Sequence, residues 1–213
     1  HRGHDDHEGH DDHKGHDDHK GHDDHKGHDD HDDHDEHSAH HHSGTDPHAW
    51  LDPDNAIAWA EAIAAQLSRI DPDNAQTYSE NLVVTTTRLK VLDAELTRIL
   101  APVAAERFVV LHDAYQYLEK HYGLANAGAI SPSDAQSPGP ARLRELAGAM
   151  ERLGVRCIMS EPQVNSGLIR AVTDGITVTA GELDPLGAAL DPGPELYPAL
   201  LRAAADSVVD CLK

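Results

Sequence analysis

The C-terminal half of the sequence alternates short apolar runs with helical patterns, and this alternation restricts the fold more than any other feature. The runs RFVVLH, LANAGAI, VRCIMS and ITVTAG predict strands at residues 107–112, 124–130, 155–160 and 176–181, the first of them buried. Helical patterns follow them, at residues 113–123, 139–154, 165–175 and 193–213. Strands that alternate with helices form parallel sheets covered on both faces. We therefore predict an α/β lobe with a four-stranded parallel sheet.

Two further helices are predicted ahead of this lobe. Asp52 and Asp71 are each followed by proline, which is a typical pair of signals for a helix start. The first helix has one apolar face, formed by Ile57, Ala60, Ile63, Ala64 and Leu67. The second runs from Asp73 to Leu100 and would be about 42 Å long at 1.5 Å per residue. Such a length suits a strut between two lobes.

The N-terminal tract has a very different composition. The hexad GHDDHK repeats, and residues 1–42 hold 16 of the 19 histidines and 15 Asp/Glu against 4 Lys/Arg. The tract has no apolar face to bury, and Gly, Asp and His are poor helix formers. We therefore predict that residues 1–43 form a disordered metal-binding loop. Its zinc sites should be weak because ordering the chain costs affinity, and we expect them among His16, His19, His22, His25, His28 and His31.

The charge of the chain excludes several classes of partner. A formal net charge of −21 disfavours nucleic acid and anionic membrane surfaces, so the expected partners are cations. HExxH, GxSxG, P-loop and GxGxxG motifs are all missing from the sequence, and we predict that the protein is not an enzyme. A zinc hydrolase with Glu161 as general base is an alternative that the spacing does not support.

Isolated ligand-type residues follow the predicted strands, at the edge where parallel sheets bind ligands. His112 ends the first strand, Glu161 follows the third, and Asp184 follows the fourth. His48, in the segment DPHAW, precedes the first helix. These residues, together with Glu182, are candidate zinc ligands, because a tetrahedral zinc site takes imidazole nitrogens and carboxylate oxygens and needs three or four of them. His121, near a predicted helix end, is expected to be a surface residue that interacts with the helix terminus.

Four segments together resemble a known family. TDPHAWLDPDNA, FVVLHDAYQYLEKHYGL, SEPQ and GELDPLG occur in the order and spacing of the zinc-specific solute-binding proteins of bacterial ABC importers, the ZnuA type. The resemblance covers residues 44–213. An acidic His-rich loop directly before DPHAW is itself a mark of the zinc-specific members.

The resemblance implies a ligand set. His48 is similar to the histidine ligand of the family's first lobe and His112 to that of the second. Asp184 matches the position that supplies a carboxylate in many relatives, whereas Glu161 matches an acidic position near the metal that is not a ligand.

The resemblance also implies a domain organisation in which the first lobe is largely missing. Residues 44–70 would be a remnant of that lobe, residues 71–101 a long interlobe helix, and residues 102–213 the C-terminal lobe. The spacing of the two cysteines leaves open whether they are free or paired. The resemblance implies a disulfide between Cys157 and Cys211.

The function that the resemblance implies is capture of Zn²⁺ in the periplasm and delivery to the membrane permease of an ABC transporter. The His-rich loop would concentrate or sense zinc, a periplasmic zinc chaperone would be a further partner, and the protein would be a monomer. A manganese-binding relative of the same family and a stand-alone His-rich zinc-buffering protein are the alternatives.

Overall fold

The computed structural model describes residues 46–131, 138–162 and 167–213. The predicted disorder of residues 1–43 and the weak sites among His16, His19, His22, His25, His28 and His31 lie outside the described residues. None of the helices in the described ranges is both long enough and apolar enough to cross a membrane.

Four parallel strands form the sheet, as predicted. They are β1 (Phe108–His112), β2 (Asn126–Ser131), β3 (Cys157–Ser160) and β4 (Thr179–Glu182), in the order β2-β1-β3-β4. Each strand begins slightly after the start of its apolar run, because the first residues of each run belong to the loop that enters the sheet.

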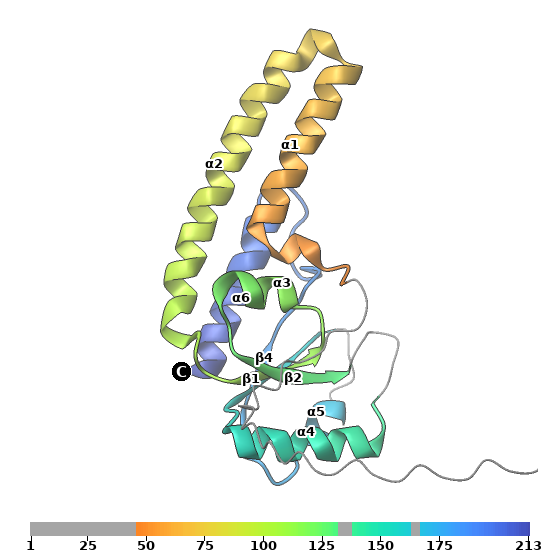
Figure 1. Ribbon diagram of the computed structural model, residues 1–213, viewed down its shortest axis with the longest axis vertical. Helices are drawn as coiled ribbons and strands as arrows, with labels where there is room; N and C mark the ends of the chain where they lie inside the picture. Colours follow the sequence, from red (N-terminus) through yellow and green to blue (C-terminus); the bar gives the residue numbers. More distant parts are fainter. Residues whose placement is uncertain (1–45, 132–137, 163–166) are drawn as a thin grey trace, which may run out of the picture. The chain divides into compact units, whose positions relative to one another are not determined.

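Helices cover both faces of the sheet (Figure 1). The helix α6 (Leu196–Leu212) packs on β3 and β4 and is itself covered by α2 (Ala75–Leu100), while α4 (Pro140–Leu153) and α5 (Gly167–Thr173) pack together on the opposite side. Along β1, Phe108 and Val110 join the core on the α6 side, and Val109 and Leu111 join the core on the α4 side. Because side chains alternate along a strand, His112 faces the α6 side.

The helix α1 (Pro53–Ile70) and α2 run side by side as an antiparallel pair (Figure 1). The predicted start of α1 is confirmed, since the Asp52 side chain accepts a hydrogen bond from the Asp54 amide. The predicted apolar face is wrong at Ile63, which is 58% exposed, and Trp59 is also exposed. In α2, which follows a short 3₁₀ turn at Pro72–Asn74, the buried residues lie in the C-terminal half: Leu89, Leu92, Leu96 and Leu100.

Three short elements complete the frame around the candidate site. The 3₁₀ turn η1 (Ala49–Leu51) precedes α1 and contacts α3 (Gln116–Tyr122), and a third 3₁₀ turn, Ala101–Val103, follows α2. The helix α3 begins later than predicted because the chain turns tightly after β1, where the Ala114 amide donates to the His112 carbonyl. It ends at Gly123, whose φ of 65° is the left-handed conformation common at helix ends.

A disulfide joins Cys157 of β3 to Cys211 of α6, as the resemblance implied. Next to it, α6 approaches β4 so closely that Gly181 has no room for a side chain. A Cβ atom there would lie 2.7 Å from the Met159 sulfur and 3.1 Å from the Cys211 Cβ. The disulfide and this glycine together fix α6 against the sheet.

Candidate metal centre

His48 lies at the N-terminal end of η1 and is held by its neighbour Asp46. Both the His48 amide, at 2.9 Å, and the ring atom Nδ1, at 2.6 Å, contact Oδ1 of Asp46. The Asp46 side chain is only 2% exposed and that of His48 12%. A carboxylate that accepts from Nδ1–H leaves the Nε2 lone pair as the metal donor of the neutral ring. The spacing of Asp46 and His48, two residues apart in the sequence, could have suggested this role for Asp46.

His112 is held in the same way by a residue from the neighbouring strand. Its Nδ1 lies 2.5 Å from Oε1 of Glu161, and both side chains are buried. The parallel register of β1 and β3 pairs Val110 with Met159, and two residues further on this register brings His112 level with Glu161. The Tyr115 hydroxyl donates to the same carboxylate oxygen, at 3.3 Å. Glu161 therefore orients the His112 ring, and that it is not itself a ligand stays a prediction.

The structure brings the His48 and His112 rings together. Their centroids are 5.3 Å apart, and their planes are inclined by 62°. A tetrahedral zinc ion with two Zn–N bonds of about 2.0–2.1 Å would place two imidazole centroids roughly 5 Å apart. The separation of the rings therefore fits two ligands of one ion.

Three hydrogen bonds anchor the His48 segment to other parts of the fold. Trp50 Nε1 donates to the Pro185 carbonyl at 2.9 Å, and the Tyr197 hydroxyl of α6 donates to the Trp50 carbonyl at 2.8 Å. The Tyr117 hydroxyl of α3 donates to the Asp46 carbonyl at 3.4 Å. The His48 and Trp50 rings also pack edge to face, with centroids 5.2 Å apart. These contacts place His48 beside the loop that follows β4.

Asp184 lies in that loop, next to Pro185. Its two carboxylate oxygens accept the amides of Leu186, at 3.1 Å, and Ala188, at 2.6 Å, and so stabilise the turn. In the described parts of the chain, Asp184 does not form a compact three-ligand group with His48 and His112. Its role as a ligand remains a prediction.

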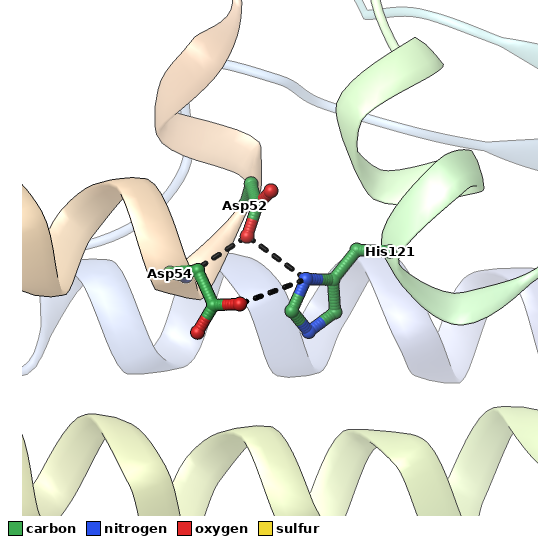
Figure 2. Close-up of side chains that lie close together, drawn as sticks. All are labelled: Asp52, Asp54 and His121. Atoms are coloured by element: carbon green, nitrogen blue, oxygen red, sulfur yellow. Dashed lines mark hydrogen bonds and ion pairs between the residues drawn. The ribbon is translucent and has the colours of Figure 1, made fainter.

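A second group of ligand-type side chains was missed by the sequence reasoning. Asp52, Asp54 and His121 have ligand atoms that all lie within 4.8 Å of one another, and among the described residues they are the one such group of three or more (Figure 2). His121 is therefore not the surface residue that was predicted: its side chain is 15% exposed and contacts carboxylates from two other helical segments. Its spacing in the sequence gave no signal, because its partners are 28 or more positions away.

The pKa values of two neighbouring tyrosines, Tyr122 and Tyr197, are affected by the negative charge in this region. Burial raises the pKa of the Tyr122 hydroxyl, and the Asp93 carboxylate raises it further. Burial also raises the pKa of Tyr197, with a contribution from the Asp52 carboxylate. The carboxylates therefore create a negative potential at the junction of α1, α2 and α3.

Comparison with known sequences decides the family. Residues 3–211 match the family described as "ZnuA: Zinc-uptake complex component A periplasmic". The chain belongs to the ZnuA family. It is similar to the high-affinity zinc uptake system protein ZnuA of Brucella abortus (strain 2308), with 44% identity over 125 residues, 59% of this chain and 37% of that protein. For the protein of the same name from Paracoccus denitrificans (strain Pd 1222), the identity is 42% over 159 residues, 74% of this chain and 49% of the relative.

Solved structures of related proteins share the fold. A laminin-binding adhesin from Streptococcus agalactiae superposes with a TM-score of 0.70 at 31% identity, covering 79% of this chain and 63% of the adhesin. A crystal structure of ZnuA gives a TM-score of 0.69 at 28% identity, covering 79% of this chain and 61% of that one. The chain thus spans about half or less of the length of the curated relatives that it matches.

Proposed function

We propose that this chain is the part of a periplasmic zinc-binding protein that supplies His48 and His112 to a high-affinity zinc site. The observation that carries the proposal is the pairing of the two imidazoles, 5.3 Å apart between centroids. In each ring Nδ1 contacts a buried carboxylate, so that Nε2 is the donor atom of the neutral ring. Zinc relatives in the same family support the choice of metal. Two imidazoles also favour Zn²⁺ over Mn²⁺, which prefers oxygen ligands.

The protein would act as a carrier rather than as an enzyme. A solute-binding protein captures its ion outside the inner membrane and delivers it to the membrane permease of an ABC transporter. Asp184, or a group from outside this chain, would complete the coordination of the ion. Zinc affinity well above manganese affinity, measured side by side, is expected; the reverse order would point to a manganese carrier.

The test is a zinc titration of the full chain in competition with a chelator of known affinity. His48→Ala and His112→Ala should each weaken the tight site by at least about 10-fold, since even residues that only orient a ligand contribute 10–100-fold. His28→Ala, which removes one of the many tract histidines, is the matched control and should leave the tight site unchanged. High affinity retained in both His48→Ala and His112→Ala would refute the assignment.

The His-rich tract would serve as a weak zinc concentrator that feeds this site. Replacing His16, His19, His22, His25, His28 and His31 with alanine in the full chain should remove weak zinc equivalents and leave the tight one. If the tight site disappears with these six histidines, the tract is the main site and the buffering alternative is correct.

A further inference from the structure

We propose that Asp52, Asp54 and His121 form a second divalent-cation site, which takes Zn²⁺ at the junction of η1, α1 and α3. Figure 2 shows the three side chains converging, with Asp52 and Asp54 from the start of α1 and His121 from the end of α3. This site is separate from the pair of His48 and His112.

The distances between ligand atoms fit a single ion. His121 Nδ1 lies 2.9 Å from Asp52 Oδ1 and 4.0 Å from Asp54 Oδ2. A tetrahedral zinc ion with bonds of about 2.0–2.2 Å separates its ligand atoms by roughly 3.4 Å, which lies between these two values. Side-chain adjustments of about half an ångström would therefore be enough to close the site.

The other nitrogen of His121 is already held as metal-binding histidines are held. Its Nε2 lies 2.8 Å from Oδ1 of Asp93, on α2. A histidine that donates one N–H to a carboxylate directs the lone pair of its other nitrogen at the metal. In the neutral ring, this contact directs the Nδ1 lone pair at Asp52 and Asp54.

The charge around His121 favours a divalent cation over a proton alone. Three carboxylates, from Asp52, Asp54 and Asp93, face one imidazole, so negative charges outnumber positive ones in either protonation state of the ring. Asp54 is 76% exposed, which gives an ion and its remaining water ligands access from solvent.

The position of the site couples it to the proposed zinc centre, and this step rests on the proposed function. Asp52 ends η1, four residues after His48, while His121 lies nine residues after His112 on the helix that contacts η1. A cation between them would hold η1 against α3 and so restrict the movement of His48 relative to His112. Zinc at the second site should therefore strengthen binding at the first, and the converse follows by linkage.

The first experiment locates the ion by zinc anomalous scattering from crystals of the full chain grown with excess Zn²⁺. We expect a peak between His121 Nδ1, Asp52 and Asp54, apart from the peak at His48 and His112. Asp54→Asn should abolish the former and keep the latter, because the exposed Asp54 side chain does not cap α1. Glu61→Gln, which removes an exposed charge from the same helix, should keep both peaks.

A solution measurement excludes binding that occurs only at crystal concentrations. Nitrogen NMR of the His121 ring, assigned with His121→Gln, should show Nδ1 shifting to a metal-bound value during a Zn²⁺ titration of the full chain. A ring that stays protonated on both nitrogens at millimolar Zn²⁺, with no anomalous peak, would show that His121 is only an imidazolium held by Asp52 and Asp93, and would overturn the proposal. A peak at His121 without one at His48 and His112 would refute the proposed function and leave the second site standing.

Discussion

Replacement of Glu161 by glutamine tests how much the protein environment contributes to zinc affinity. The Glu161 side chain is 4% exposed, and its Oε1 lies 2.5 Å from His112 Nδ1. Glutamine has almost the same volume and keeps one oxygen that can accept from Nδ1–H. The change therefore removes the negative charge and little else from this contact.

The expected magnitude follows from the kind of hydrogen bond that is lost. Bonds to an ionised acceptor are about twice as strong as neutral ones, and a carboxylate behind a metal-binding imidazole makes it a better donor. Loss of such a partner costs about 10–100-fold in metal affinity, equivalent to about 1.4–2.8 kcal/mol. Burial and the short contact place Glu161 towards the upper end of this range, since the low local dielectric strengthens the interaction.

The assay is chelator competition for zinc on the full chain, with thermal unfolding of the metal-free protein as a check on folding. Glu161→Gln should raise the Kd of the tight site by one to two orders of magnitude. Glu151→Gln removes an exposed charge on α4 and should leave the Kd unchanged. If Glu161→Gln binds zinc within about threefold of the parent while remaining folded, the carboxylate does not support a ligand, and His112 loses its assigned role.

Three further predictions concern stability and local opening. Replacing both cysteines of the disulfide with alanine should lower the free energy of unfolding by about 4 kcal/mol in denaturant titrations, the chain-entropy value for a separation of 54 residues. The Arg202 guanidinium holds the pKa of Glu95 below its usual value, so Glu95→Gln should lower the denaturation midpoint at neutral pH, and this difference should vanish as the pH falls below about 4. Amides of residues 51–52 should exchange with solvent hydrogen faster than those of residues 109–111, as mass spectrometry of short peptides can show.

The α/β lobe was predictable because its signals are local. The strands β1 and β3 are short runs of buried residues, and α1 and α4 each have proline at their start, so these elements could be recognised without knowledge of distant contacts. The parallel arrangement alone predicted that His112 and Glu161 would lie at the same edge of the sheet, beyond the carboxyl ends of the strands. Their contact follows from strand register, which the sequence does not state but which the period of two restricts.

The rest of the site depends on contacts that no local pattern encodes. His121 meets Asp52 and Asp93 because α3 packs between the start of α1 and the C-terminal half of α2, and the three residues have no common spacing. The exposure of Ile63 and Trp59 likewise depends on what packs against α1, whereas an apolar stripe says only that burial would be favourable.

The two proposed ligands are held with very different strength, and this difference bears on how zinc could be released. His112 belongs to a strand in which every residue is buried, whereas His48 precedes a single 3₁₀ turn anchored by the hydrogen bonds of Trp50, Tyr117 and Tyr197. Each such bond contributes about 0.5–1.5 kcal/mol net and the burial of Leu51 about 1.5–3 kcal/mol, so detaching the His48 segment would cost several kcal/mol, while moving His112 would require the sheet to open. An opening of this kind moves one imidazole away from the ion and leaves the other in place. The affinity for zinc therefore falls while the lobe stays folded. A cation at Asp52, Asp54 and His121 would oppose this opening by holding η1 against α3.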